Sequence, residues 1–241
     1  MKISIVVPAF NEEKLLPATL QSIRAASAAF VTRGWIVELV VCDNNSTDRT
    51  ADIARAEGAH VVFEPINQIA RARNTGAAAA TGDWIIFVDA DSLPSRELFA
   101  DVADAILGGR CLAGGVTVEL DQWSMGLWFF TRIWNTISRF NRWCAGSFIF
   151  VDAEAFRAIG GFSHELFVSE ELDLSQRLHK LAKQRGKRVV ILRRHPLVTS
   201  ARKVHLYGHL AHLKFLWRLV VRRGRVLRTR ADCAIWYDGL R

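Results

Sequence analysis

The segment ARNTGAAAATGDWIIFVDAD, residues 72–91, contains the pattern that decides the fold. Its alanine-rich first half is typical of a helix, Gly82 predicts the end of that helix, and the apolar run from Trp84 predicts a buried strand. The strand ends in Asp89 and Asp91, which would point to the same side of an extended chain. Two such carboxylates repel each other unless a cation or a ligand offsets their charge, but an isolated D-x-D triplet is more often a solvated acidic loop.

Helical and strand patterns alternate throughout the first 90 residues. Helices are expected over residues 12–29, 47–57 and 68–80, with Ser46 and Asn67 as N-caps. The expected strands are ISIVV, VELVVCD, HVVF and WIIFVD. This alternation predicts βαβ units, and therefore an α/β fold with a mostly parallel, Rossmann-like sheet flanked by helices. Ligands in such sheets bind beyond the carboxyl ends of the strands, here residues 8–10, 43–45 and 89–91.

The second half is less regular. Strands are expected at CLAGGVTVEL, GSFIFVD and KRVVIL, a helix at residues 169–184, and an aromatic-rich stretch at residues 122–143. No linker or repeat divides the chain. We therefore expect one compact unit over residues 1–204, followed by a basic helical segment.

Composition limits the class of protein. The chain has 241 residues, 50% of them hydrophobic, which is enough for a sizeable core. The four cysteines are scattered and lack metal-ligand spacing, which favours a reducing, cytoplasmic location. The N-terminus reads as a strand rather than as a signal peptide, and no apolar stretch approaches the roughly 18 to 20 residues that span a bilayer.

The charge is divided unevenly along the chain. Residues 1–180 carry 16 Lys and Arg against 22 Asp and Glu, a net charge of −6, whereas residues 181–241 carry 16 against 2, a net charge of +14. This asymmetry indicates an anionic partner for the C-terminal part, such as phosphate groups, an anionic membrane or nucleic acid. Nucleic acid is the least favoured of these, because no nucleic-acid-binding motif accompanies the charge.

The usual nucleotide-binding signatures are missing. The loop after the first strand, PAFNEE, has neither G-x-G-x-x-G nor a P-loop. The strand exits supply carboxylates instead, at Glu12, Asp43, Asp89 and Asp91. A carboxylate there accepts hydrogen bonds from a base or a ribose, and a pair of them suits a divalent cation held against a diphosphate.

Five motifs occur in an order that resembles the inverting family-two glycosyltransferases of the GT-A fold. They are VVPAFNEE, VVCDNNSTDRT, ARNTGAAAATGDWIIFVDAD, CAGSFIFVDAEAFRAIGGF and SEELDLSQRL. The resemblance covers roughly residues 1–200. It implies a GT-A domain over residues 1–204, with a nucleotide-binding half at residues 1–91, a smaller acceptor half at residues 92–204, and a basic amphipathic extension at residues 205–241.

The resemblance also implies site residues. A divalent cation, Mg²⁺ or Mn²⁺, would be held by Asp91 with Asp89, and it would stabilise the leaving diphosphate. Asp89 would also approach the ribose, and Asp43 the base. The residues implied to bind the donor are Pro8, Ala9, Phe10, Glu12, Asp43, Arg73, Asn74, Asp89, Ala90 and Arg202, with His205 a weaker candidate beside Arg202.

The segment SEELDLSQRL is the candidate source of a general base. Similar enzymes carry Glu-Asp here, with the aspartate taking the proton of the acceptor hydroxyl, whereas this chain has Glu170-Glu171. Alignment favours Glu171, and its extra methylene leaves Glu170 as a competitor. The resemblance thus implies transfer of sugar from a UDP- or GDP-sugar to a hydroxyl acceptor by single displacement with inversion. The Glu-for-Asp change is the feature that favours the alternative, a non-catalytic nucleotide-sugar or membrane-binding protein on the same fold.

Two segments suggest contact with lipid. The region from His205 to Arg230 has a basic amphipathic pattern, and Trp123, Trp128, Trp134 and Trp143 lie in one short span. They indicate a lipid-linked acceptor, such as a precursor of a cell-envelope polysaccharide, or peripheral contact with the inner face of an anionic membrane. Burial of these apolar sides within the protein or in a homodimer is an equally good interpretation.

Overall fold

The computed structural model describes residues 1–122 and 124–202. Strands and helices alternate through the first half: β1 (Lys2–Ala9), α1 (Leu16–Val31), β2 (Ile36–Asp43), α2 (Thr50–Ala56), β3 (His60–Phe63), α3 (Ile69–Ala79) and β4 (Trp84–Val88). The second half contains β5 (Ser92–Leu93), α4 (Arg96–Leu107), β6 (Cys111–Leu120), α5 (Met125–Asn141), β7 (Phe148–Asp152), α6 (Ala153–Ala158), α7 (Glu170–Gln184) and β8 (Arg188–Thr199).

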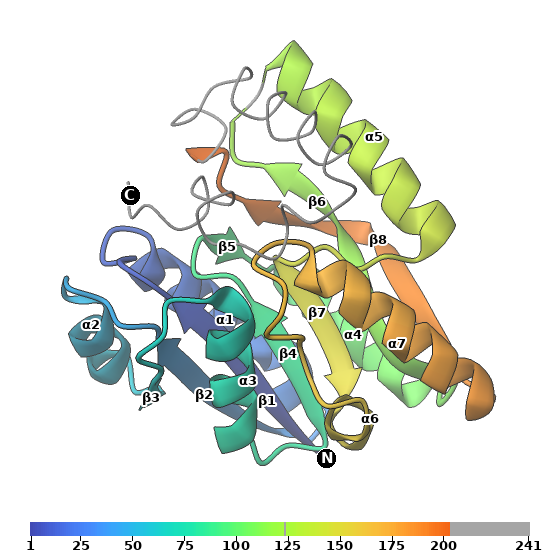
Figure 1. Cartoon of the computed structure of the whole chain (residues 1–241), viewed down its shortest axis with the longest axis horizontal. Coiled ribbons are helices and arrows are strands. Elements are labelled where there is room, and N and C mark those ends of the chain that lie inside the picture. The colour runs from blue at the N-terminus through green and yellow to red at the C-terminus, as the bar shows by residue number, and fades with distance from the viewer. Residues whose placement is uncertain (123, 203–241) are drawn as a thin grey trace.

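One sheet runs through the molecule in the order β3-β2-β1-β4-β7-β6-β8-β5 (Figure 1). The first four strands are parallel, as the βαβ pattern predicts. In the second half, β7 is antiparallel to both β4 and β6, β8 is parallel to β6, and β5 is antiparallel to β8. The α/β fold is therefore confirmed; the sheet is wholly parallel in its N-terminal half and mixed in its second half.

Side chains of β1 divide between two hydrophobic clusters, one on each face of the sheet. Ile3, Ile5 and Val7 pack in the cluster that includes residues of α1 and α4, whereas Val6 packs in the cluster that includes residues of α3, α6 and α7. Both faces of the sheet are thus covered, which explains why the central strands are almost continuously apolar.

The helices begin later than the sequence patterns predict. α1 begins at Leu16 rather than at residue 12, α2 has Arg49 rather than Ser46 at its N-cap, and α3 has Gln68 rather than Asn67. For α1 and α2, the reason is that polar residues in the two preceding loops bond to each other. The N–H of Asn11 donates to Ser46, and the N–H of Glu12 donates to Thr50. The predicted extension at residues 205–241, with His205, lies outside the described residues.

The described residues contain no helix that is long and apolar enough to cross a membrane.

Gly76 sets the distance between α3 and β1. A Cβ atom at this position would lie 2.4 Å from Cγ1 of Val6. We predict that Gly76→Ala lowers the free energy of unfolding by about 1–3 kcal/mol, because the overpacking outweighs the gain in helix propensity. Gly126→Ala in α5 is the matched control, since a Cβ there meets nothing within 4 Å. Chemical denaturation measures both; equal stability of the two variants would contradict the prediction.

Candidate functional site

A pocket opens at the carboxyl ends of β1 and β4, beside the first turn of α7. It holds about 920 Å³ of space, including the part open to solvent. The lining residues are Pro8, Ala9, Phe10, Glu12, Asn44, Asn67, Ile69, Ala72, Arg73, Asp89, Ala90, Asp91, Gly146, Phe167, Val168, Ser169, Glu170 and Glu171. Residues far apart in the sequence thus meet at the edge of the sheet where ligands of α/β proteins bind.

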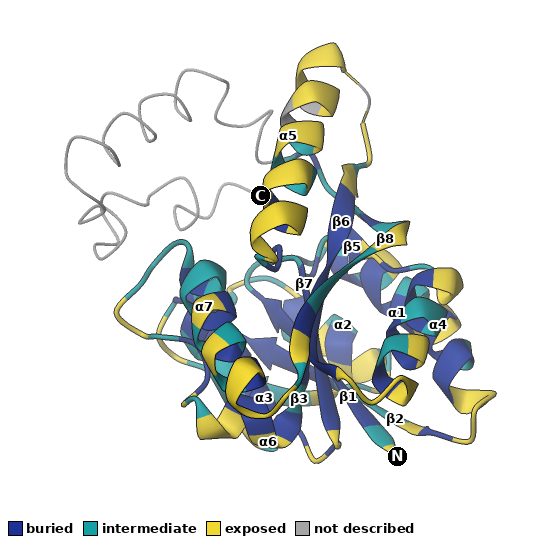
Figure 2. Ribbon diagram, turned by 90° about the vertical axis from the view of Figure 1, so that its right-hand side faces the viewer, coloured by how far each residue is buried: buried dark blue, intermediate teal, exposed yellow. Residues whose placement is uncertain are grey.

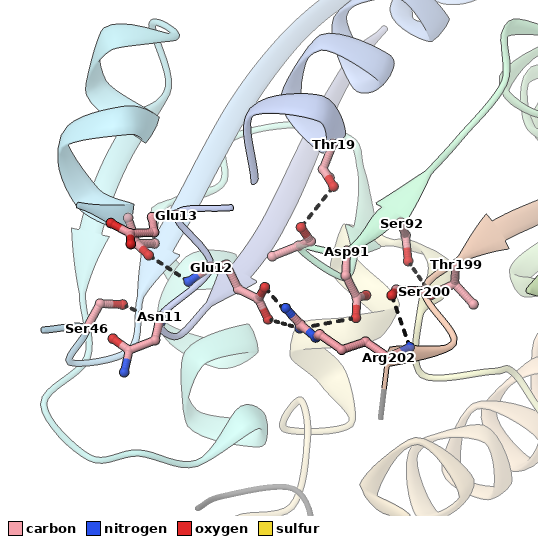
Figure 3. Close-up of polar contacts among 12 residues, drawn as sticks. Asn11, Glu12, Glu13, Thr19, Ser46, Asp91, Ser92, Thr199, Ser200 and Arg202 are labelled. Carbon is pink, nitrogen blue, oxygen red and sulfur yellow. Dashed lines mark hydrogen bonds and ion pairs between the residues drawn. The ribbon is translucent and has the colours of Figure 1, made fainter. Parts of the chain in front are cut away.

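The loop after β1 is held by the loop after β2 (Figure 3). The backbone N–H of Asn11 donates to Oγ of Ser46 at 3.0 Å, and the N–H of Glu12 donates to Oγ1 of Thr50 at 2.8 Å. Asn11 has a φ of 52°, a conformation that asparagine tolerates better than most residues. These bonds fix the backbone of Glu12 so that its carboxylate lies in the pocket.

Arg202, which follows β8, joins two carboxylates of the pocket (Figure 3). Its Nη2 lies 2.9 and 3.1 Å from the two carboxylate oxygens of Glu12 and 3.8 Å from Oδ2 of Asp91. The Nε of Arg202 is buried and has no hydrogen-bond partner among the described residues. The residue that follows β8 by three positions therefore brings a cation to the carboxylates at the ends of β1 and β4.

Arg73 lies at the back of the pocket with 1% of its surface exposed. Its Nη1 donates to Oε1 of Glu170 at 2.6 Å, and its Nη2 donates to Oδ1 of Asp89 at 3.0 Å and to the carbonyl of Gly146 at 2.7 Å. The guanidinium also lies 5.1 Å from the ring centroid of Phe162. One buried cation therefore connects the D-x-D segment, the start of α7 and the segment before β7.

The two glutamates at the start of α7 have different surroundings. Glu170 is 4% exposed and paired with Arg73. Burial raises the pKa of Glu170, and the positive charge of Arg73 counteracts this. Glu171 is partly exposed; burial, followed by the charge of Glu170, raises the pKa of Glu171 to about 8. The two carboxyl groups therefore differ in exposure and in their pairing with Arg73.

Ser169 turns the chain into α7 with a left-handed backbone, at φ 66° and ψ 20°. This conformation is uncommon for a residue with a side chain, and outliers of this kind gather at functional sites. The turn places both glutamates in the first helical turn and against the pocket.

The carboxylates of the D-x-D segment suit a cation shared with a ligand. The described residues contain no group of three or more His, Cys, Asp and Glu side chains that could hold a metal ion alone. Mg²⁺ and Mn²⁺ are commonly held by one or two carboxylates together with phosphate oxygens of a substrate. Asp89 already bonds Arg73, whereas Asp91 lies 3.8 Å from Arg202. The residues present therefore fit a cation held mainly by Asp91 and completed by a diphosphate.

Most of the residues predicted to form a site meet in this pocket, and three do not line it. Asp43 is buried beside it, and its Oδ1 accepts the backbone N–H of Ser46 at 3.1 Å. Asn74 bonds both the carbonyl and the N–H of Phe162, each at 2.9 Å. Arg202 reaches the pocket through its ion pairs with Glu12 and Asp91. The roles predicted for these residues in binding a donor remain predictions.

The sequence patterns missed several lining residues. Asn44 is one that its place after the second strand could have suggested. Its Nδ2 donates to the carbonyls of Glu64 and Ile66, and its Oδ1 accepts the N–H of Gln68, which fixes the start of α3. The segment Phe167-Val168-Ser169 carries no polar pattern, and only the folded chain shows that it forms a wall of the pocket.

The fold and this pocket define an α/β protein of the GT-A type. The sequence model of glycosyl transferase family 2 matches residues 4–159, well over half of the chain. The chain therefore belongs to glycosyl transferase family 2.

Curated relatives match in shorter segments. An uncharacterized glycosyltransferase of Mycobacterium bovis is 37% identical over 113 residues, which cover 46% of this chain and 47% of the relative. An undecaprenyl-phosphate 4-deoxy-4-formamido-L-arabinose transferase of Klebsiella pneumoniae is 38% identical over 117 residues, which cover 43% of this chain and 33% of the relative. The matched part spans about half or less of the length of these relatives.

Solved structures match nearly the whole chain. A mannosyltransferase from Pyrobaculum calidifontis, in complex with GDP-Man and Mn²⁺, has a TM-score of 0.66 at 19% identity, covering 99% of this chain and 73% of that one. Glucosyl-3-phosphoglycerate synthase from Mycobacterium tuberculosis, in complex with Mn²⁺, UDP-glucose and phosphoglyceric acid, has a TM-score of 0.61 at 20% identity, covering 97% and 80%. At these identities the likeness shows the fold alone.

Arg73 is predicted to stabilise the site by neutralising two carboxylates. Arg73→Met should lower the free energy of unfolding by about 3–5 kcal/mol, because it leaves Glu170 and Asp89 without their buried partner. Adding Glu170→Gln should restore part of the loss by removing one unpaired charge. Arg55→Met is the control; it breaks an exposed pair with Asp52 and should cost less than about 1 kcal/mol. Denaturation in urea measures all three, and an equally small loss for Arg73→Met and Arg55→Met would refute the prediction.

Proposed function

We propose that the protein transfers a sugar from a UDP- or GDP-sugar to a hydroxyl group of an acceptor, with inversion at the anomeric carbon. The observation that carries this proposal is the meeting, in one pocket, of the D-x-D segment with two glutamates from α7. Such a pocket has both parts that the reaction needs, a place for the leaving diphosphate and a carboxylate to accept a proton.

The donor nucleotide would lie across the carboxyl ends of β1, β2 and β4. Pro8, Ala9 and Phe10 form an apolar wall suited to a nucleoside, with Glu12 near the ribose. Asp43 would bond the base through the oxygen that Ser46 leaves free, and Asp89 with Ala90 would bound the ribose and diphosphate. The structures with UDP-glucose and GDP-Man support a uridine or guanosine donor.

A divalent cation, Mg²⁺ or Mn²⁺, would be held by Asp91 with help from Asp89. When bound, it would stabilise the negative charge that develops on the leaving diphosphate. The structural relatives with Mn²⁺ support this choice of cofactor.

Arg202 would contact the diphosphate from the other side. Its guanidinium pairs with the carboxylates of Glu12 and Asp91. The buried Nε, which lacks a partner among the described residues, is a donor that a phosphate oxygen would satisfy. Arg202 would thus contribute to the site through both its ion pairs with the carboxylates and a contact with the phosphate.

Glu171 would be the general base and Glu170 a positioning residue. Glu170 is held by Arg73, which limits its reach. Glu171 is partly exposed to the pocket, and a base whose pKa lies near the working pH combines the correct protonation state with a strong tendency to accept a proton. Its proton would come from the acceptor hydroxyl as that oxygen attacks the anomeric carbon and the sugar–phosphate bond breaks.

The acceptor is proposed to be lipid-linked, as in the assembly of a cell-envelope polysaccharide. The relative from Klebsiella pneumoniae, which by its name acts on undecaprenyl phosphate, supports this class. The second candidate, a non-catalytic nucleotide-sugar-binding protein, is favoured only by the glutamate that replaces the usual aspartate.

Glu171→Gln is predicted to reduce sugar transfer by roughly 100-fold or more, since the amide cannot accept the proton. Nucleotide affinity, measured by calorimetry, should change little because Glu171 lies on the acceptor side of the pocket. Glu154→Gln, at a carboxylate whose side chain is 80% exposed, is the control and should keep full activity. Retained turnover in Glu171→Gln would remove Glu171 as the base. No turnover in the wild-type protein, with intact nucleotide binding, would favour the non-catalytic alternative.

Donor and metal are predicted to stabilise the protein together. In a thermal-shift screen, a UDP- or GDP-sugar at about 100 times its dissociation constant should add about 2.7 kcal/mol of stability. Omitting Mn²⁺ should remove much of this, and Asp91→Asn should make the shift independent of Mn²⁺. Asp104→Asn, at a surface ion pair with Arg33, is the matched control and should respond like the wild type. If no nucleotide sugar raises the melting temperature, the donor assignment fails.

A further inference from the structure

Helix α5 exposes a continuous apolar face. Figure 2 shows the helix rising from the body of the protein with exposed residues along most of its length. The exposed fractions are 77% for Met125, 50% for Trp128, 61% for Phe129, 44% for Ile133, 40% for Ile137 and 89% for Phe140. These positions recur every three or four residues, so they form one stripe. An apolar stripe of this length on a helix is larger than the scattered apolar residues of an ordinary surface.

The orientation of α5 is fixed by polar contacts on its opposite side. The side-chain amide of Asn135 accepts the N–H of Val118 at 3.0 Å and donates to the carbonyl of Val118 at 2.9 Å. Ser138 is fully buried, with its Oγ donating to the carbonyl of Trp143 at 2.6 Å. Trp134 packs against the core cluster that includes β6. The body of the protein therefore contacts the side of α5 that carries Trp134, Asn135 and Ser138, and the apolar stripe faces outward.

The charged residues of α5 and of the segment that follows it are all basic. No Asp or Glu occurs between residues 122 and 151, whereas Arg132, Arg139 and Arg142 do. All three arginines are exposed, and the guanidinium of Arg132 lies 5.2 Å from the ring centroid of Trp128. Tryptophan and arginine beside an apolar helix face are typical of helices that lie at a membrane surface.

Three occupants of this face can be compared by their charge: a second copy of the chain, residues 203–241, and an anionic membrane. A second copy that docked through its own α5 would bring the same three arginines against the first set. Residues 203–241 carry nine Lys and Arg against two Asp, so this segment is also strongly positive. Like charges oppose both contacts, whereas anionic lipid headgroups attract the arginines and the acyl chains accept the apolar side chains.

We propose that the exposed face of α5 is a membrane-docking surface, which lies in the interface of an anionic bilayer with Phe129 and Phe140 among the acyl chains. The chain continues from α5 to Gly146, whose carbonyl bonds Arg73 in the pocket wall. Docking would thus hold the pocket at a fixed place relative to the bilayer. The proposal concerns a surface outside the pocket, so its test requires no transfer activity.

An environment-sensitive fluorophore attached to the full chain tests this directly. The label is placed at Phe140→Cys in a Cys233→Ser background. The remaining cysteines, Cys42, Cys111 and Cys144, should react little with the label, because burial raises the pKa of their thiols to about 12. Leu107→Cys on α4, 60% exposed in the wild type, carries the control label. Vesicles of phosphatidylcholine with phosphatidylglycerol should shift the emission at position 140 to the blue and leave position 107 unchanged. Because residues 203–241 also attract anionic vesicles, attachment through them alone would shift neither label.

A second measurement separates apolar insertion from charge attraction. At high salt, Phe129→Ser with Phe140→Ser should weaken vesicle binding roughly tenfold or more, since two large apolar side chains no longer enter the bilayer. Phe63→Ser with Leu107→Ser, at two exposed apolar positions away from α5, should bind like the wild type.

Three results would overturn the proposal. One is vesicle binding with no spectral shift at position 140. Another is a label that is already shifted to the blue without vesicles at every protein concentration, which would indicate that residues 203–241 cover α5. The third is a shift that appears without vesicles only as the protein concentration rises, which would indicate a contact between two copies.

Discussion

The buried guanidinium of Arg73 organises the site. A charge with 1% exposure is stable in the interior only when partners surround it, and here they come from three segments. Asp89 follows the central parallel strands, Glu170 begins α7, and Gly146 precedes β7. The cation therefore joins the parallel half of the sheet to the mixed half at the wall of the pocket. Gly146 is suited to this position, since a Cβ there would lie 3.3 Å from Nη2 of Arg73.

The same charge gives two adjacent glutamates different surroundings. Glu170 pairs with Arg73, and the negative charge of Glu170 adds to burial in raising the pKa of its neighbour Glu171. A sequence comparison alone leaves the two residues as competitors for the role of base. Their contacts in the folded chain favour Glu171, and they also suggest why glutamate can stand where similar enzymes have aspartate: its carboxylate reaches the pocket while the first turn of α7 is held by its neighbour.

Much of the N-terminal half of the fold could be predicted from the sequence, because the buried strands and the helices between them have distinct periods and the carboxyl ends of parallel strands meet at one edge. Asp89, Asp91 and Glu12 could be assigned to the pocket in this way. The contact of Arg73 with Glu170 could not, since the two residues are 97 positions apart and no local pattern joins them. The N-caps predicted at Ser46 and Asn67 were wrong. The side chain of Ser46 accepts the N–H of Asn11, and that of Asn67 accepts a hydrogen bond from the amide of Asn45. For α5, the aromatic pattern fitted burial, a dimer or a membrane equally well, and only the folded chain shows which side faces outward.

The pH dependence of sugar transfer, compared between the wild type and Glu170→Gln, tests the central claim that the Arg73–Glu170 pair sets Glu171 as the base. Glu171 accepts a proton only when it is ionised, so the rate should rise with pH and reach half its maximum near pH 8, the pKa of Glu171 in the folded protein. Removing the negative charge of Glu170 leaves Arg73 and Asp89 as the nearest charged groups, and the half-maximum should move to lower pH. A rate that is independent of pH across this range, or a half-maximum that is the same in both proteins, would contradict the account.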